Sequence, residues 1–515
     1  MSGADAAAGG EHPIPRHAGW LKAVVVLATL MQVLDMTIAN VALPHMRSAL
    51  GANQDTISWV LTSYILASAV VIPMSGWLSD RIGRRRLYLL SVAGFVAASV
   101  LCGLAINIHE MVLFRILQGL SGAFLSPLAQ AVMLDSTPRE KHARAMALFG
   151  MGIVLGPVLG PVLGGWLTEH FNWRWVFFVN VPLGLVALTG LWFLLPDARH
   201  PPRRFDRIGF LLVALALASF QLMLDRGEHV DWFSSPEIWI EMFVSISALW
   251  MFVVHSMGVR EPLWRKDLLR DRNLLVGVAL MAVMGFVLTG PMALMPIMLQ
   301  GIFGYSVMDT GLVLATRGIG VIFMMSVAAR LVERISVRAM IATGWAIIAA
   351  TFWEMTQWNL DITWEMMALN GFVQGLGTGL VFVTISTVPF TTLPARHRTD
   401  AAGLVNLSRS MGSSISVSLV ITLLSRNAAV SNADLTNNLT PYALGVDPRM
   451  FTLPDNLAES GLAMLQAEVS RQAGMISFLD DFTFMMWITI CAIPLTLLVK
   501  AAQKNDKDER VFVLE

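Results

Sequence analysis

The sequence has 515 residues, of which 55% are hydrophobic and 14% are charged, and its formal net charge is zero. Soluble globular proteins carry about 25% charged residues, so this composition predicts a protein that lies mainly in lipid. The balanced charge gives no sign of a nucleic-acid partner. Both cysteines, Cys102 and Cys491, lie in apolar runs and are interpreted as small hydrophobic residues, which predicts neither a disulfide nor a metal site.

Fourteen segments are long and apolar enough to cross a bilayer, which takes about 20 mostly apolar residues per helix. The first run lacks a clear cleavage site, so we interpret it as a retained helix and not as a signal peptide. The predicted spans are 20–44, 57–78, 87–106, 111–134, 143–167, 174–195, 208–224, 237–257, 274–299, 310–332, 339–358, 364–393, 402–425 and 479–502.

Arginine and lysine concentrate in the loops that follow the even-numbered spans and in the C-terminal tail. The opposite loops hold few basic residues, and half of these lie in one long polar loop at 426–478. Basic residues of short loops stay in the cytoplasm. The asymmetry therefore predicts an even number of spans with both termini in the cytoplasm.

The first span contains Asp35, in the stretch QVLDMTIANVALP (32–44), with no Lys or Arg in the neighbouring turns. An acidic residue at mid-span costs roughly 2.5–3.5 kcal/mol, which makes it a functional candidate by default. At 1.5 Å per residue, Asp35 lies about 14 Å below the outer end of its span and Arg115 about 8 Å below that of the fourth span. Gln118 lies nearly one turn deeper than Arg115 on the same face.

Two interpretations of Asp35 remain open. Desolvation raises the pKa of a carboxyl and a nearby cation lowers it, so the approach and departure of Arg115 could make Asp35 bind and release a proton. Alternatively, a static pair of Asp35 with Arg115 or with the backbone only holds the helices together.

The stretch GWLSDRIGRRR (76–86) follows the second span. One interpretation is a basic anchor that keeps this loop in the cytoplasm. The other is a conformational latch, in which Asp80 and Arg84 interact with neighbouring helix ends for roughly 0.3–1 kcal/mol each, and Gly83 permits the tight turn. The residues of this candidate latch are Gly76, Asp80, Arg81, Gly83 and Arg84.

Small residues recur every four positions in the fifth span and form one smooth helix face, which lets another backbone approach closely. Two prolines in this span each remove a backbone hydrogen bond and favour a kink. The glycines are Gly152, Gly156, Gly160 and Gly164, and the prolines are Pro157 and Pro161.

The chain repeats itself at an offset of 253–256 residues. SDRI (79–82) matches VERI (332–335), QGL (118–120) matches QGL (374–376), and TPREKHARA (137–145) matches LPARHRTDA (393–401). Parallel six-span repeats are a recurring plan of transporters. We therefore divide the chain into a cytoplasmic tail (1–19), an N-terminal six-helix bundle (20–195), an inserted helix pair with its linkers (196–272), a C-terminal six-helix bundle that includes the outer loop (273–502), and a second cytoplasmic tail (503–515).

Other polar residues inside the spans are candidates for lining or supporting a substrate cavity. Arg317 and Arg409 are deep cations that could pair with helix carbonyls or with an anionic substrate, and static pairing is favoured for Arg317. The full set is Gln32, Asn40, Gln118, Arg317, Asn406 and Arg409.

Three stretches carry a family resemblance. GWLSDRIGRRR resembles the loop 2–3 signature of the major facilitator superfamily, RILQGLSGA (115–123) its fourth-span motif, and GPVLGPVLGG (156–165) the fifth-span motif of its drug exporters. LDMTIANVALP (34–44) and the fourteen spans resemble the EmrB/QacA type of fourteen-helix drug–proton antiporters. DRGEHVDWFSS (225–235) and NLSRSMGSSI (406–415) are most similar to its EmrB branch.

The resemblance implies an all-α membrane fold with two pseudo-symmetric six-helix halves and an inserted helix pair. It implies that Asp35 and Arg115 couple transport to protons. It also implies that the glycine face of the fifth span meets the opposite half and seals one side during exchange.

By the same resemblance, the protein is an inner-membrane exporter of hydrophobic or amphipathic toxic compounds that works by alternating access. Its energy source is the proton gradient, without a cofactor. An EmrA-like periplasmic adaptor, touching 426–478, and a TolC-like outer-membrane channel would complete the route.

Two alternatives remain. The first is a dedicated exporter of one metabolite, such as a siderophore or fatty acid, on the same fold. The second is an intramembrane enzyme or a sensor, which the sequence disfavours because it lacks GxxxxGK[ST], HExxH and GxSxG motifs.

Overall fold

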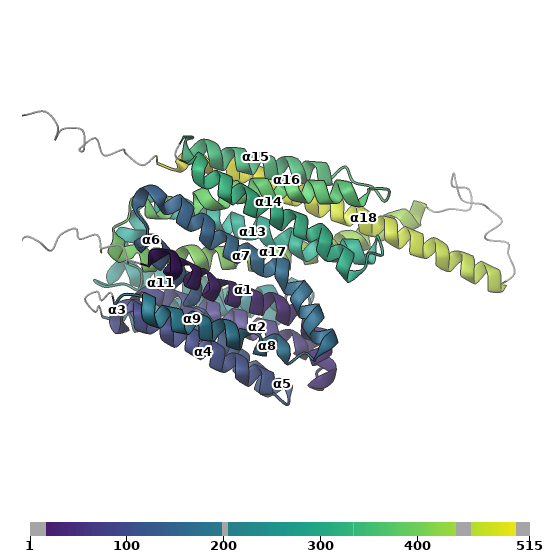
Figure 1. Ribbon diagram of the computed structural model, residues 1–515. Helices are drawn as coiled ribbons and strands as arrows, with labels where there is room; N and C mark the ends of the chain where they lie inside the picture. The colour runs from purple at the N-terminus through teal and green to yellow at the C-terminus, as the bar shows by residue number, and fades with distance from the viewer. Residues whose placement is uncertain (1–16, 198–203, 333, 439–454, 501–515) are drawn as a thin grey trace, which may run out of the picture.

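The computed structural model describes residues 17–197, 204–332, 334–438 and 455–500. Every regular element in these ranges is a helix. Figure 1 shows two groups of helices, a lower one that contains α1, α2, α4 and α9, and an upper one that contains α14, α15 and α16. By length and composition, thirteen of the described helices can cross a membrane. The predicted all-α membrane fold is confirmed.

The N-terminal half holds the first six spans, and three of these are interrupted by short breaks. Pro73 lies in the 3-10 turn Ile72–Met74 between α2 and α3, at a helix start, where its missing N–H is tolerated. The elements are α1 (Ala18–Ala49), α2 (Gln54–Val71), α3 (Ser75–Ile82), α4 (Arg84–Leu104), α5 (Ile108–Gly122), α6 (Leu125–Asp135), α7 (His142–His170), α8 (Trp175–Phe178) and α9 (Asn180–Leu194).

The C-terminal half holds the last six spans. One of its helices, α15, falls outside the thirteen apolar helices but packs against both α16 and α18, and it completes the predicted set of fourteen. The elements are α13 (Arg272–Gly301), α14 (Val307–Leu331), α15 (Val337–Met355), α16 (Trp364–Ile385), α17 (Arg398–Asn438) and α18 (Asp455–Leu495).

The predicted inserted pair consists of α10 (Arg207–Arg226) and α11 (Pro236–Gly258), which pack against each other and precede the short α12 (Lys266–Arg270). Helix α10 also contacts α2 and α17, so the pair touches both halves. Across the first contact, Thr62 Oγ1 donates a hydrogen bond of 2.5 Å to Asp225 Oδ2. Across the second, Ser418 Oγ donates one of 2.6 Å to the carbonyl oxygen of Leu224.

The segment 426–478, predicted as a loop, is largely helical. Helix α17 continues to Asn438 and α18 begins at Asp455, while residues 439–454 lie outside the described ranges. Figure 1 shows α18 projecting well beyond the other helices. A hydrogen bond of 3.2 Å from Asn432 Nδ2 to Ser470 Oγ joins the two extensions. Their polar composition suits helices that leave the bilayer and face water.

Helix starts follow short polar residues that cap the free backbone N–H groups. Asn107 Oδ1 accepts a hydrogen bond from the N–H of Glu110 at 2.9 Å. Asp271 Oδ1 accepts one from the N–H of Leu274 at 2.8 Å. These caps fix where α5 and α13 begin, at polar residues that precede the apolar runs.

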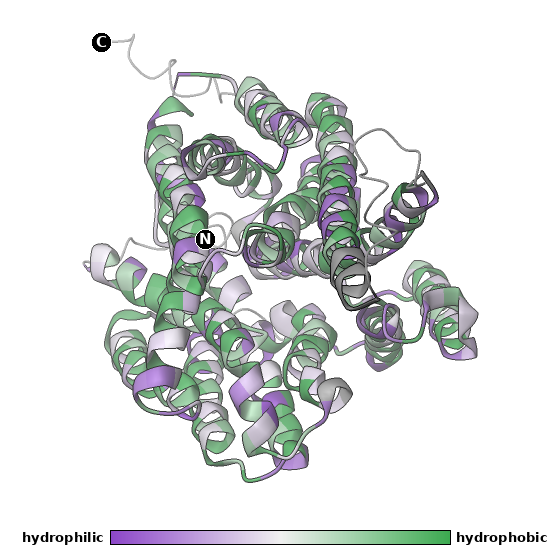
Figure 2. Ribbon diagram, turned by 90° about the vertical axis from the view of Figure 1, so that its right-hand side faces the viewer, coloured by the Kyte–Doolittle hydropathy of each residue, from purple (hydrophilic) through white to green (hydrophobic). Residues whose placement is uncertain are grey.

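Large apolar side chains cover the outside of the bundle. Figure 2 shows hydrophobic residues on most helices, viewed from the end at which α18 projects. Phe193, Phe243 and Trp250 are 79%, 71% and 66% exposed. A soluble monomer rarely leaves such a surface in water, so this belt indicates contact with lipid.

Glycines let the helices of the C-terminal half cross at close range. A Cβ atom on Gly285 of α13 would collide with the carbonyl oxygen of Arg409 on α17, and one on Gly412 would collide with that of Ala282. Between α14 and α16, a Cβ on Gly375 would collide with the carbonyl oxygen of Arg317. Backbone atoms cannot move aside as a flexible side chain can, so a larger residue at these positions forces the helices apart.

The glycine face of α7 packs within its own half. Cβ atoms on Gly152, Gly156, Gly160 and Gly164 would meet Val26, Val33, Thr37 and Ile38 of α1, respectively. The prediction that this face meets the opposite half is wrong. Helix α7 contacts α14 of the other half through a different face, on which Val158 lies against Gly318.

We predict that Gly285→Ala lowers the free energy of unfolding by about 1–3 kcal/mol, because the new methyl group overlaps a backbone carbonyl. The matched control is Gly165→Ala, where a Cβ would find no atom within 4 Å. Thermal unfolding midpoints of the detergent-purified variants measure the difference. Equal midpoints would show that the α13–α17 crossing adjusts without strain.

Candidate functional site

Asp35 lies fully buried inside the N-terminal half, surrounded by hydrogen-bond donors. Arg115 Nη1 lies 2.7 Å from Asp35 Oδ2. Gln118 Nε2 and Asn180 Nδ2 both donate to Asp35 Oδ1, at 2.8 Å and 2.6 Å. These donors come from α5 and from the start of α9, so the structure brings together Asp35, Arg115 and Gln118 as the depth argument predicts. We call these residues with Asn180 the Asp35 cluster.

Arg115 is held in place by further contacts. Its Nε donates to the carbonyl oxygen of Val60 on α2 at 2.8 Å, and its Nη1 also donates to Gln118 Oε1 at 2.7 Å. The Tyr64 ring lies under the guanidinium, with 4.4 Å from Cζ to the ring centroid. Nη2 of Arg115 is buried and has no hydrogen-bond partner among the described residues. One nitrogen of the Arg115 guanidinium therefore has N–H groups without an acceptor among the described residues.

Asn180 is a member of the cluster that sequence reasoning missed. Its Nδ2 also lies 3.0 Å from Ser99 Oγ of α4, and Ser99 Oγ donates to the carbonyl oxygen of Phe177 at 2.9 Å. Asn180 is the only polar residue in the run VFFVNVPLGL (176–185), and this isolation is the signal that could have identified it.

The Asp35 cluster is electrically neutral in this conformation, since one carboxylate faces one guanidinium. Removing one partner of a buried ion pair is strongly destabilising, because the remaining charge is left without compensation. A proton on Asp35 would neutralise the carboxylate and weaken its hold on Arg115.

The other candidate cavity residues lie apart from this cluster. Gln32 Oε1 accepts a hydrogen bond from Ser126 Oγ of α6 at 2.9 Å, and Asn40 is exposed. Asn406 Nδ2 donates to Gln130 Oε1 at 2.9 Å, which joins α17 to α6 across the two halves. Arg409 is half-buried, and its Nη2 lies 3.5 Å from Asn406 Oδ1.

The candidate latch centres on an acid that the sequence did not single out. Asp135, at the end of α6, forms ion pairs with both Arg84 and Arg398. Arg84 begins α4 in the N-terminal half, whereas Arg398 begins α17 in the C-terminal half. This bridge ties the two halves together at the end predicted to face the cytoplasm.

The remaining latch residues surround this bridge. Gly83 has φ +91°, a conformation that favours glycine. Asp80 is half-buried on α3, Arg81 is exposed, and Gly76 is buried. Helix α3 packs against α17, so the whole segment lies at the contact between the halves.

Asp481 of α18 is a second buried acid that sequence reasoning missed. It is fully buried, and neither carboxylate oxygen has a hydrogen-bond partner among the described residues. Its signal was the acidic pair in FLDDFTF (478–484), at the start of the last predicted span.

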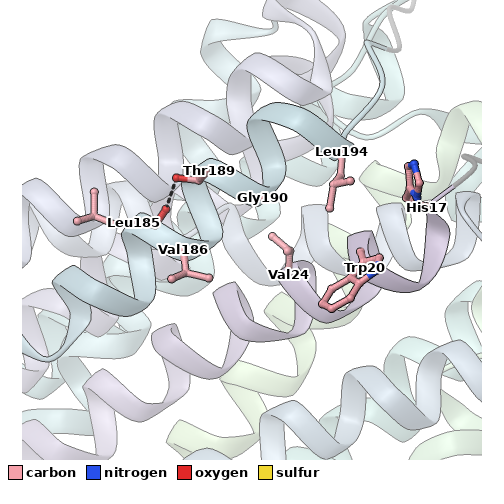
Figure 3. A pocket seen from close by; sticks show the side chains of 8 residues that line it. All are labelled: His17, Trp20, Val24, Leu185, Val186, Thr189, Gly190 and Leu194. Atoms are coloured by element: carbon pink, nitrogen blue, oxygen red, sulfur yellow. Dashed lines mark hydrogen bonds between the residues drawn. The ribbon is translucent and has the colours of Figure 1, made fainter.

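A large open depression lies on the outside of the bundle between α1 and α9. Figure 3 shows its lining, which includes Trp20, Val24 and Leu194, and its volume is about 620 Å³. None of its lining residues belongs to the Asp35 cluster. Its lining is almost wholly apolar, so it fits a hydrocarbon chain better than it fits a site of proton chemistry.

No group of three or more His, Cys, Asp or Glu side chains within the described ranges could hold a metal ion.

Comparison with known proteins agrees with the architecture. The model of the Major Facilitator Superfamily matches residues 25–417. Two solved structures share the fold. The human organic anion transporter MFSD10 has a TM-score of 0.63 and 14% identity, and the match covers 94% of this chain and all of that chain. The proton:xylose symporter XylE has a TM-score of 0.61 and 13% identity, and the match covers 94% of this chain and 96% of that chain.

Sequence relatives are more similar. The multidrug export protein EmrB of Haemophilus influenzae is 35% identical over 81% of this chain and 82% of its own length. The fatty acid resistance protein FarB of Neisseria gonorrhoeae is 33% identical over 93% and 96%, and EmrB of Escherichia coli K12 is 31% identical over 92% and 94%. The chain therefore belongs to the Major Facilitator Superfamily and, within it, to the family of the EmrB multidrug export proteins.

Proposed function

We propose that this protein is a proton-driven exporter of hydrophobic and amphipathic toxic compounds in the bacterial inner membrane, with both termini in the cytoplasm. The observation that carries the proposal is the buried Asp35–Arg115 pair, 2.7 Å apart, in a family whose relatives include multidrug export proteins. An intramembrane ion pair is expensive to build, so it favours a role in ion coupling over a purely structural one.

In this proposal, binding of a proton to Asp35 alternates with binding of the drug. When the cluster is open to the outer side, a proton binds Asp35 and releases Arg115 from its carboxylate. When drug enters from the cytoplasm or the inner leaflet, Arg115 returns and the proton leaves. The proton gradient supplies the energy, and no cofactor takes part.

Alternating access requires that the halves separate at one end while they close at the other. The bridge of Asp135 with Arg84 and Arg398 supports a state that is closed at the cytoplasmic end. Opening this end would break the contact of Asp135 with Arg398, because these residues belong to different halves.

A dedicated exporter of one metabolite is the second candidate, and the similarity to a fatty acid resistance protein favours a fatty acid as that substrate. A resistance panel in a deletion strain separates the two. A multidrug exporter protects against several unrelated dyes and uncouplers, whereas a dedicated one protects against long-chain fatty acids alone.

We also propose that the protein works with an EmrA-like periplasmic adaptor and a TolC-like outer-membrane channel. The projecting ends of α17 and α18 would offer the adaptor a polar helical surface outside the bilayer.

The proposed topology predicts opposite labelling of two exposed positions. In a chain whose Cys102 and Cys491 are replaced by alanine, Ala433→Cys should react with a membrane-impermeant maleimide added to spheroplasts. Glu140→Cys should react only after the membrane is permeabilised. The reverse pattern would contradict the proposed orientation.

The role of Asp35 predicts loss of proton coupling in Asp35→Asn. Ethidium, which does not itself titrate near neutral pH, should expel about one proton per chain from the wild type in weakly buffered detergent and none from Asp35→Asn. Asp481→Asn is the matched control, because it removes the other fully buried acid of the described residues and should release the wild-type number. Equal release from Asp35→Asn and the wild type would make Asp35 structural, and loss in Asp481→Asn alone would move the coupling site to α18.

The Asp135 bridge predicts that Asp135→Asn opens the cytoplasmic end. The change leaves Arg84 and Arg398 facing each other without a counter-charge, so the separated state should gain population several-fold. Spin labels at Glu140→Cys and Thr392→Cys measure this as a longer distance in pulsed electron resonance. Asp267→Asn, an exposed acid whose ion partner Arg265 lies two residues away, should leave the distances unchanged. Unchanged distances in Asp135→Asn would exclude the bridge as a latch.

A further inference from the structure

A small cavity of about 20 Å³ lies inside the C-terminal half, among α13, α14 and α16. This volume holds roughly one particle the size of a water molecule. The residues that matter for its chemistry are Pro291, Arg317, Trp358, Asn370, Gly371 and Gln374.

Unsatisfied donors gather at this cavity. Arg317 is 5% exposed, and its Nη2 donates to the carbonyl oxygen of Val287 at 3.2 Å. Its Nε and Nη1, and also Nε2 of Gln374, are buried without hydrogen-bond partners among the described residues. A buried donor that lacks an acceptor is destabilising, and more so when the donor is charged. These three nitrogen atoms have no acceptor among the described residues.

The internal repeat explains why this space exists. Pro291, Gly371 and Gln374 stand 256 residues after Asp35, Arg115 and Gln118, an offset within the range of the sequence repeat. The glutamine is kept, but the two charged side chains of the N-terminal half are replaced by proline and glycine. The space that an ion pair fills in one half is partly empty in the other, and Arg317 enters it from the neighbouring helix α14.

The substitution leaves a cation without its acid. Within the described ranges, Arg317 forms no ion pair. Asn370, which lines the cavity, donates a hydrogen bond of 3.0 Å from Nδ2 to the carboxylate of Glu354. Glu354 itself does not line the cavity. A buried guanidinium without a counter-charge is strongly unfavourable in a low-dielectric interior.

We propose that the cavity binds one small monovalent anion of about the size of chloride, held by Arg317 and Gln374. The anion takes the part that the Asp35 carboxylate plays in the N-terminal half. The volume admits a single atom-sized ion and excludes a drug or a polyatomic carboxylate. The site is independent of the proposed transport function, since it rests on the C-terminal half alone.

Binding of radioactive chloride tests the proposal directly. The full chain, purified in detergent and exchanged into sodium gluconate, should bind about one ³⁶Cl⁻ per chain in equilibrium dialysis. Arg317→Gln should bind none. The matched control is Arg409→Gln, which removes another deep cation that the cavity does not use and should bind as much as the wild type.

A carboxylate placed by mutation provides the second test. Pro291→Asp introduces an acid at the position that corresponds to Asp35, so it should bind no chloride. Chloride should raise the thermal unfolding midpoint of the wild type in a saturable manner, because a ligand that binds only the folded state stabilises it. The midpoint of Pro291→Asp should not respond to chloride.

Two results would overturn the proposal. A wild type that binds no chloride would show that the cavity holds only water. Equal chloride binding by Arg317→Gln or Pro291→Asp and the wild type would place the anion elsewhere.

Discussion

The ion pair of Asp35 and Arg115 is the interaction on which the N-terminal half depends. A bilayer offers no water to a buried charge, so each charge must find its partners inside the protein. Asp35 finds them on α5 and α9, and Arg115 finds a further acceptor on α2. The pair thereby fixes how four helices face one another, and any change in its charge state acts on all of them.

Helix packing follows a second constraint, because lipid gives no hydrophobic force that drives helices together. Close contact must come from small residues, and the glycines of α7, α13 and α16 supply it. Helix α7 uses two faces for two purposes. Its glycine face stays against α1 within one half, while its Val158 face meets Gly318 on α14 of the other half.

Much of this architecture could be predicted from the sequence, because apolar runs and loop charges report directly on membrane crossing. The depth of Asp35, Arg115 and Gln118 could be predicted for the same reason. Helix rotation could not, so the partner of the α7 glycine face was predicted wrongly and Asn180 was overlooked. Asp135 was missed because its partners Arg84 and Arg398 lie far apart in the chain and meet only when the halves close. The helical form of 426–478 was missed because a polar helix outside the bilayer has no apolar run to reveal it.

Helix α17 is long enough to connect the Asp135 bridge at one end of the molecule with the projecting helices at the other. It runs without a break over 41 residues, or about 60 Å at 1.5 Å per residue, which is twice the thickness of the hydrocarbon core. One end carries Arg398, which holds the opposite half through Asp135, and the other end reaches Asn438 in the projecting pair. Such a helix can act as a lever. If it tilts by about 10° around its midpoint, a tip about 30 Å from that point moves by about 5 Å. If α17 tilts as a rigid rod, a change at the Asp135 bridge displaces its far tip on the other side of the membrane.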